Sequence, residues 1–163
     1  MKILIISDSH GYDGHFFDIL AKEGEPDMLI HCGDVHGNGE VYRRAVSCPL
    51  KMVAGNNDMW SGTSLASEEE FDIGSHHVFL THGHRYGVSY GTEKVLDAAF
   101  ARGADVVLFG HTHRPLAEFD EDYGIWAVNP GSISMPRQSN GKPSYVILEM
   151  GEDDDLCFTI KYL

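Results

Sequence analysis

The sequence predicts an α/β sandwich with a mixed sheet system, and three observations support this fold class. Five short aliphatic runs each end in polar residues, which is typical of buried strands that deliver side chains to one edge of a sheet. A stretch with helical spacing of its apolar residues separates the fourth run from the fifth. After His113 the pattern changes to hairpins, so antiparallel strands should complete the parallel ones.

The first element is the aliphatic run at residues 3–6, ILII. It lacks in/out alternation, which indicates a parallel-type strand buried on both faces. Asp8 and His10 follow two positions apart, and side chains at that spacing in extended backbone point the same way, so they could share one ligand. The alternative is that Asp8 or Ser9 caps the helix indicated by residues 16–24.

Four further aliphatic runs lie within residues 27–37, 50–58, 76–85 and 104–114. They end in G-D, G-N-N-D, H-G-H and G-H-T-H. The glycines before Asp34, Asn56 and His111 are typical of strand ends that turn sharply, where the backbone adopts conformations that a side chain would hinder. His76 and His77 follow Gly-Ser and are expected to belong to a turn.

The helix predicted between the fourth and fifth runs covers residues 92–103, with Thr92 as its cap and Gly103 as its stop. Strand, helix and strand in this order imply a right-handed parallel crossover. Residues 115–129 form one expected hairpin, and residues 144–163 form a second with a charged turn, GEDDDLC. Since ligands collect at the carboxyl ends of strands in open α/β sheets, the five polar clusters should meet there.

Composition limits the class of protein. A length of 163 residues with 42% hydrophobic content suits one domain, residues 1–163, without a linker. The N-terminal apolar run is too short for a signal peptide or membrane span, so we expect a cytoplasmic protein without membrane association. The net charge of -13 opposes non-specific binding to nucleic acid. The three cysteines are odd in number and show no paired spacing, which argues against a disulfide framework or a cysteine zinc site.

The polar clusters supply seven candidate metal ligands, which are oxygen and imidazole donors without a thiolate. Such a set suits Mn, Zn, Fe or Ni better than an all-oxygen magnesium or calcium site. Seven ligands are too many for one tetrahedral ion, whereas two divalent ions that share a bridging carboxylate would use all of them. The candidates are Asp8, His10, Asp34, Asn56, His82, His111 and His113.

The motifs D-S-H, G-D-V-H-G, G-N-N-D, T-H-G-H and G-H-T-H, in this order, resemble the calcineurin-like metallophosphoesterase superfamily, in particular its YfcE-type phosphodiesterase branch. The segment N-P-G-S at residues 129–132, followed by Pro136 and Arg137, is similar to the tail of that branch. The resemblance implies a four-layer αββα sandwich and a two-metal site, commonly activated by manganese. It implies that Asp8, His10 and His113 hold one metal, that Asn56, His82 and His111 hold the other, and that Asp34 bridges them.

One position departs from the superfamily pattern. Many members have G-N-H-D or G-N-H-E, with a histidine that assists the leaving group, whereas this chain has Asn57 followed by Asp58. An amide is not a general acid at neutral pH. His84 or His36 could substitute as the proton donor. The catalytic candidates are the two residues at the departing motif, Asn57 and Asp58, together with His84. Arg137 is the candidate for phosphate binding, since a guanidinium fork suits that anion.

The function that this pattern favours is metal-dependent hydrolysis of phosphate esters, most of all diesters, by a hydroxide that bridges two metal ions. We expect a small phosphate ester as the substrate, and assembly into a homo-oligomer is left open. One alternative is a scaffold, because the superfamily includes a retromer subunit that uses the fold chiefly for protein contacts. The other is a nucleotide or nucleic-acid phosphoesterase, which the acidic composition disfavours. A candidate at every ligand position favours the enzyme over the scaffold.

Overall fold

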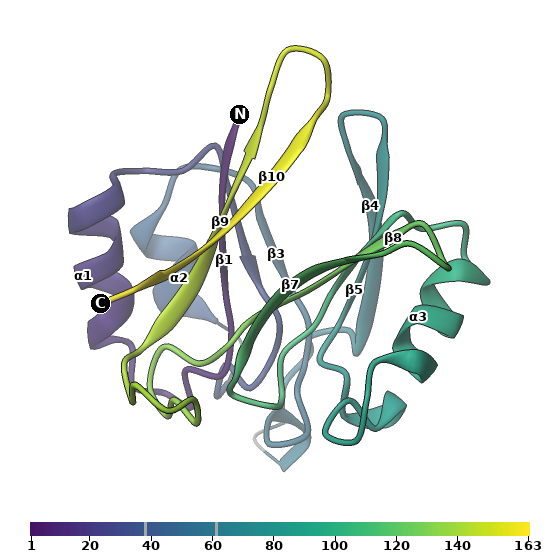
Figure 1. Ribbon diagram of the computed structural model, residues 1–163. Helices are drawn as coiled ribbons and strands as arrows, with labels where there is room; N and C mark the ends of the chain where they lie inside the picture. The colour runs from purple at the N-terminus through teal and green to yellow at the C-terminus, as the bar shows by residue number, and fades with distance from the viewer. Residues whose placement is uncertain (38, 61) are drawn as a thin grey trace.

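The computed structural model describes residues 1–37, 39–60 and 62–163, and it contains two five-stranded mixed sheets (Figure 1). In the first sheet the order is β10-β9-β1-β2-β3. Its three N-terminal strands pair in parallel, whereas β9 runs antiparallel to both β1 and β10. The bounds are β1 Lys2–Ile6, β2 Met28–His31, β3 Leu50–Met52, β9 Ser144–Met150 and β10 Leu156–Tyr162.

The second sheet has the order β4-β5-β6-β8-β7. Strands β5, β6 and β8 pair in parallel, and the edge strands β4 and β7 are antiparallel to their neighbours. Both expected hairpins are therefore present, β7–β8 in this sheet and β9–β10 in the other. The bounds are β4 Glu68–Ile73, β5 His76–Thr81, β6 Val106–Leu108, β7 Pro115–Asp120 and β8 Ile125–Pro130.

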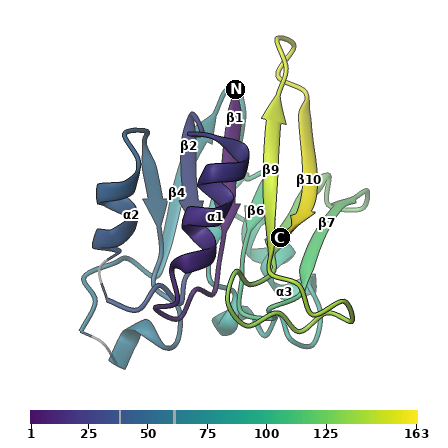
Figure 2. The same cartoon turned by 90° about the vertical axis from the view of Figure 1, so that its left-hand side faces the viewer.

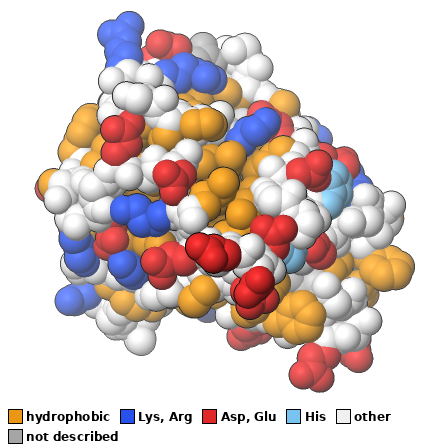
Figure 3. All heavy atoms as spheres, turned by 90° about the horizontal axis from the view of Figure 1, so that it is seen from above, with side chains coloured by type: hydrophobic (Ala, Val, Ile, Leu, Met, Phe, Trp, Pro, Cys, Tyr) orange, Lys and Arg blue, Asp and Glu red, His pale blue; other side chains and the backbone are white. Residues whose placement is uncertain are grey.

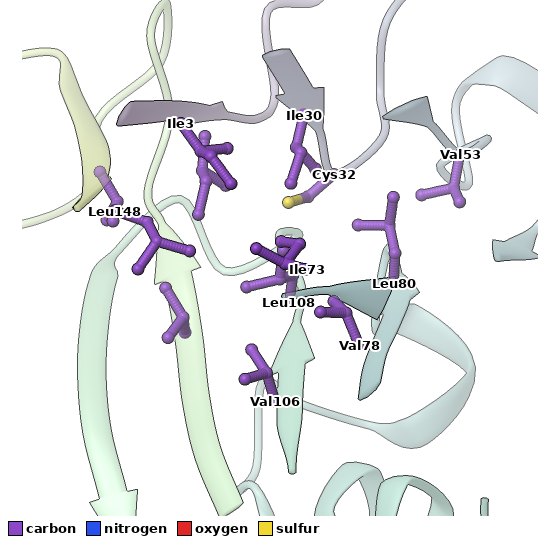
Figure 4. Packing of buried hydrophobic residues seen from close by; sticks show 13 residues of the cluster. Ile3, Ile30, Cys32, Val53, Ile73, Val78, Leu80, Val106, Leu108 and Leu148 are labelled. Carbon is purple, nitrogen blue, oxygen red and sulfur yellow. The ribbon is translucent and has the colours of Figure 1, made fainter. Parts of the chain in front are cut away.

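Helices cover the outer faces of the two sheets, with α1 and α2 on the first and α3 on the second (Figures 1 and 2). The two sheets face each other across a shared core, in which Ile3 and Ile30 point toward Leu80 and Leu108 (Figure 4). This order of layers confirms the predicted four-layer αββα sandwich. The helices are α1 Gly14–Glu23, α2 Glu40–Ala45 and α3 Glu93–Phe100, with the single turns η1 Asp58–Trp60 and η2 His84–Tyr86.

Strand β1 shows why an uninterrupted aliphatic run is needed at the centre of a sheet. Ile3 and Ile5 belong to the core between the sheets, whereas Leu4 and Ile6 pack under α1 and α2. All four side chains are fully buried, because successive residues of a strand face opposite sides and both sides are covered here.

Three local expectations need correction. His76 and His77 begin strand β5 and do not form a turn, because both pair with residues of β4. Helix α1 begins after Asp13, so neither Asp8 nor Ser9 caps it. Thr92 precedes α3 as expected, but its side chain makes no capping hydrogen bond.

The two ends of the sandwich differ. The parallel strands end on the side shown at the bottom of Figure 1, where the polar clusters lie. At the opposite end, acidic and basic side chains surround a central strip of hydrophobic ones (Figure 3). Among the described residues, no helix is both long enough and apolar enough to cross a membrane.

Candidate metal centre

The predicted ligands lie on loops at the carboxyl ends of strands from both sheets. Asp8 and His10 follow β1, Asp34 follows β2, and His82 follows β5. Backbone hydrogen bonds join these loops: the N–H of Asp8 donates to Gly33 O at 3.0 Å, and the N–H of His10 donates to Asp34 O at 2.9 Å. Parallel pairing of β1 with β2 therefore brings the first ligands together.

The backbone at the site is held in the left-handed region. Within the described residues, seven non-glycine residues have positive φ, and six of them lie in the ligand loops. Aspartate and histidine tolerate this conformation better than most residues, but it still costs free energy, and such strain concentrates at functional sites. The six are Asp8, His10, Asp34, His36, His111 and His113.

The three glycines that precede ligands are required for different reasons. Gly33 has φ +103, as expected for a sharp turn, and an added Cβ would lie 2.5 Å from His82 Nδ1. Gly55 and Gly110 have no positive φ. They are needed for space, because a Cβ would lie 2.1 Å from Asp34 Oδ1 at Gly55 and 2.1 Å from Ser7 Oγ at Gly110.

One compact group contains Asp8, His10 and His113, and its ligand atoms lie within 4.8 Å of one another. Asp8 Oδ1 is 3.1 Å from His113 Nε2 and 3.9 Å from His10 Nε2. The other oxygen, Oδ2, accepts hydrogen bonds from the Ser7 hydroxyl at 2.6 Å and from the His111 N–H at 3.0 Å. These contacts hold the carboxylate so that Oδ1 faces the two imidazoles.

A second compact group contains Asp8, Asp34 and His82. Asp34 Oδ2 lies 3.4 Å from His82 Nε2 and 3.7 Å from His10 Nε2, so this carboxylate lies between the two groups. Asp8 is also shared, since its Oδ1 is 3.9 Å from His82 Nε2. The sequence pattern did not indicate that both carboxylates belong to the second group.

Asn56 and His111 contact each other next to His82. Asn56 Oδ1 is 3.0 Å from His111 Nδ1, and the His111 and His82 rings are 5.3 Å apart. The structure therefore brings all seven predicted ligands to one end of the molecule, five in the two compact groups and these two beside them.

The donor atoms of this site fit divalent cations. His82 donates its Nδ1 proton to Cys32 O at 2.8 Å, and His113 donates its Nδ1 proton to Met135 O at 2.7 Å. A backbone carbonyl can only accept, so Nε2 of each neutral ring carries a lone pair, which is the orientation of metal-binding histidines. Within the described chain, His82 Nε2 and Asp8 Oδ1 are buried without a hydrogen-bond partner. Two acceptor atoms that face each other in this way need positive charge between them, either a proton on His82 or a metal ion.

The electrostatics of the site also favour positive charge. Burial alone would lower the pKa of His82, but the carboxylates of Asp34 and Asp8 outweigh it and raise that pKa to about 9. Burial would raise the pKa of Asp34, yet contacts with His82 and Asn57 lower it well below its ordinary value. Both carboxylates therefore stay ionised, and the site stabilises a cation at the position of the His82 proton.

The catalytic candidates are placed differently from one another. Asn57 donates from Nδ2 to Asp34 Oδ2 at 2.7 Å and from its backbone N–H to Oδ1 at 2.9 Å, so its amide holds a ligand. Asp58 is fully buried and accepts backbone N–H groups of Val35, His36 and Gly55. This geometry gives Asp58 the task of fixing two ligand loops, and it offers no support for a role in proton transfer.

His84 and Arg137 lie at the border of the centre. The His84 ring is 5.5 Å from the His82 ring, and its buried Nδ1 has no hydrogen-bond partner among the described residues. Burial, together with His82 and His111, lowers the pKa of His84 to about 4. Arg137 is exposed and donates its backbone N–H to His113 O at 3.0 Å.

The supporting roles of some residues were not identified from the sequence. The Ser132 and Ser134 hydroxyls both donate to Asp8 O, at 2.7 and 2.8 Å, which explains the position of the N-P-G-S segment. Asn129 of the same segment donates to Gly110 O at 2.7 Å. Small polar residues at the end of a strand were the available signal, but their partners are more than a hundred residues away in the case of Asp8.

Comparisons with known proteins agree with this geometry. Residues 1–153 match the family model of the calcineurin-like phosphoesterase superfamily domain. The chain is 37% identical to a probable metallophosphoesterase, YsnB, of Bacillus subtilis, over 94% of this chain and 86% of that protein. It is 28% identical to the phosphodiesterase YfcE of Escherichia coli, over 91% of this chain and 88% of that protein.

A solved structure shares the fold at lower identity. Wild-type Vps29 of Entamoeba histolytica, crystallised in complex with Zn²⁺, superposes with a TM-score of 0.75 at 23% identity and covers 99% of each chain. The sequence match over most of the chain, the ordered ligand motifs and the paired sheets have the same explanation: the chain belongs to the calcineurin-like phosphoesterase superfamily.

Proposed function

We propose that this protein is a metal-dependent phosphodiesterase that hydrolyses small phosphate esters at a centre of two divalent metal ions, with manganese as the activating metal. The superfamily membership and the phosphodiesterase relative support hydrolysis of phosphate esters. The two-metal arrangement, the choice of metal and the preference for diesters go beyond those comparisons and are the content of the proposal.

One observation carries the proposal. Asp8 Oδ1 and His82 Nε2 are buried, lie 3.9 Å apart and have no hydrogen-bond partner in the described chain. Burying such atoms without partners costs about 1–3 kcal/mol each, so a fold is expected to keep them only where a ligand satisfies them. Divalent ions bound between carboxylates and imidazoles would do so.

The proposed ligand sets follow the two groups and their neighbours. Asp8, His10 and His113 would hold one ion, Asn56, His82 and His111 would hold the other, and Asp34 would contact both. When bound, two divalent ions supply Lewis acidity, which neutralises phosphate charge and makes water a better nucleophile.

The remaining residues orient this centre and limit its chemistry. Asn57 holds Asp34 with two hydrogen bonds and cannot protonate a leaving group. His84 is uncharged at neutral pH, because burial and the neighbouring imidazoles lower its pKa to about 4. It can donate a hydrogen bond to the departing oxygen but is a poor source of a full proton. Hydrolysis should therefore favour esters whose leaving group is already stable, such as nitrophenolate.

The test measures metal content and turnover on the same preparation. After chelation and reloading with Mn²⁺, elemental analysis should give about two ions per chain, and bis(p-nitrophenyl) phosphate should be hydrolysed. Metal binding alone does not separate the enzyme from a scaffold, since a Vps29 was crystallised with Zn²⁺. Two bound ions without hydrolysis of any chromogenic monoester or diester would favour the scaffold. At most one ion under saturating conditions would refute the two-metal centre.

A further inference from the structure

A separate cavity of about 390 Å³ lies beside the metal centre. Its wall combines the loop between η2 and α3, the loop that follows β6, the beginning of β7, and Arg137. The volume falls in the range of small-molecule pockets, about 300–1,000 Å³. None of the ligand residues described above lines it, so it is a second place where a small molecule can be bound.

The cavity is positively charged, although the chain has a net charge of -13. Among the described residues that line it, Arg114 and Arg137 are the only charged ones. Across residues 1–37, 39–60 and 62–163, neither guanidinium contacts a carboxylate, and Arg114 Nε donates to Arg137 O at 3.3 Å. Elsewhere Arg102 pairs with two glutamates. Two arginines without a carboxylate partner in one cavity of an acidic protein indicate an anionic ligand.

Hydroxyl groups add further donors for an anion. The Ser89 and Thr92 side chains line the cavity, and neither has a hydrogen-bond partner within the described part of the chain. Guanidinium and hydroxyl groups together are donors that proteins use for phosphate.

The rest of the cavity wall is apolar, because Val88, Phe109 and Leu116 also line it. A bare inorganic ion would leave this surface in contact with water, whereas an organic phosphate would cover it. The cavity adjoins the metal centre through the loop of Thr112 and Arg114, which flanks His113 on both sides. A molecule that extends from the metal centre around this loop would reach the two arginines.

We propose that this cavity binds a second phosphate group of the substrate, so that the preferred substrate is a phosphodiester in which one alcohol carries a further phosphate. The proposal rests on the proposed function, because it assumes that the scissile phosphate lies at the metal centre. The reaction itself does not change: water attacks the diester phosphorus, one alcohol departs with a proton, and the second phosphate is retained.

The experiment compares two substrates that differ in one phosphate. Thymidine 5′-(p-nitrophenyl phosphate) and its 3′-phosphorylated form both release nitrophenol, and only the second can occupy the cavity with a phosphate. In the Mn²⁺-loaded protein, kcat/KM should be about tenfold higher for the phosphorylated form, since a charge-assisted hydrogen bond contributes at least about 1.4 kcal/mol, or tenfold. In the double variant Arg114→Gln, Arg137→Gln this ratio should fall to about one. The control Lys94→Gln removes a nearby exposed charge that does not line the cavity, and it should keep the wild-type ratio.

A binding measurement separates failure of this proposal from failure of the proposed function. If the wild type hydrolyses neither substrate, the proposed function is wrong, but calorimetry with thymidine 3′-phosphate and metal-free protein still tests the cavity. Saturable binding that weakens about tenfold in the double variant and not in Lys94→Gln supports the site.

Three results would overturn the assignment. The first is an equal loss of kcat/KM for both substrates in the double variant, which would place the arginines at the scissile phosphate. The second is the absence of thymidine 3′-phosphate binding to the metal-free wild type. The third is binding of inorganic phosphate that is as strong as that of thymidine 3′-phosphate and does not compete with the phosphorylated substrate, which would make free phosphate the ligand.

Discussion

Substitution of Gly55 by alanine should damage the metal centre although Gly55 is not a ligand. A Cβ at this position would lie 2.1 Å from Asp34 Oδ1 and 2.4 Å from Asp34 N. Ordinary contact begins at 3.4 Å, so the carboxylate would have to move by about 1 Å. The Asp34 backbone cannot retreat easily, because the neighbouring Gly33 already lies against His82.

The consequences follow from what holds Asp34. Its carboxylate accepts two hydrogen bonds from Asn57, at 2.9 and 2.7 Å, and its Oδ2 faces His82 Nε2 at 3.4 Å. Metal–ligand distances tolerate about 0.2 Å, so a shift of about 1 Å should lower Mn²⁺ affinity at least 10- to 100-fold. Overpacking costs about 1–3 kcal/mol in the free energy of unfolding, and about 2 kcal/mol corresponds to a Tm lower by roughly 4–8 °C.

The assay is calorimetric titration of chelated protein with Mn²⁺, with thermal unfolding measured in parallel. Gly14→Ala is the matched control: Gly14 begins α1, an added Cβ meets no atom within 4 Å, and its φ is not positive. That variant should bind Mn²⁺ like the wild type and gain about 0.4–1 kcal/mol in stability. If Gly55→Ala binds two Mn²⁺ ions with wild-type affinity, the space beside Asp34 does not control the position of this ligand, and the reasoning fails.

Three further predictions concern other parts of the molecule. His76 Nδ1 faces Asp105 Oδ2 at 2.6 Å and Nε2 faces Asp154 O at 2.8 Å; both are acceptors, so the ring must carry two protons. Burial lowers the pKa of His76, but the hydrogen bonds to Asp154 and Asp105 outweigh it and raise the pKa above 6.5. The stabilisation is therefore complete below about pH 6.5 and is lost as the pH rises through the raised pKa. In urea unfolding, the free energy of unfolding of the wild type minus that of His76→Gln should fall from about 1 kcal/mol toward zero over this range. A difference that does not change with pH would contradict this prediction. Asp34→Asn should bind fewer than two Mn²⁺ ions per chain and should hydrolyse bis(p-nitrophenyl) phosphate about 100-fold more slowly, whereas His77→Gln should change neither quantity. Full activity of Asp34→Asn at saturating Mn²⁺ would show that another carboxylate bridges the ions. Asn57→His should raise the ratio of alkyl to nitrophenyl ester hydrolysis. The increase should stay well below the 10²–10⁴-fold gain typical of general acid catalysis, because the substitution also removes the amide that holds Asp34. A wild type that cleaves alkyl esters as fast as nitrophenyl esters would mean that another group supplies the proton.

The hydrophobic pattern located most of the strands, but it did not predict strand β4 or the short helix α2. The uninterrupted apolar run Ile3 to Ile6 identifies a central strand buried on both faces. The predicted apolar stripe of α3 consists of Val95, Leu96, Ala99 and Phe100; the first three are buried as expected, whereas Phe100 is exposed. The hydrophobic pattern does not assign secondary structure correctly where side chains are half-buried and polar. His76 and His77 were expected in a turn, but cross-strand pairing with β4 makes them the start of β5.

The sequence also predicted which candidate ligands would lie together, because polar residues that follow parallel strands collect at the carboxyl edge of their sheet. Parallel pairing brings together the clusters after β1, β2 and β3 in one sheet and those after β5 and β6 in the other, and the packing of the two sheets joins the two sets. The chemistry of the donors then limited the metals, since an imidazole and carboxylate set without thiolate excludes several classes of site.

Only the tertiary structure decided what each residue does within the site. Asn57 proved to hold Asp34, Asp58 to fix backbone N–H groups of two loops, and Gly55 to leave room for a carboxylate from another strand. The sequence indicates which residues are buried and which backbone conformations are preferred, because both follow from residue types and their near neighbours along the chain. Hydrogen bonds between loops depend on the register of strands and on how two sheets are packed, and residues far apart in the chain acquire a shared role only when that packing is complete.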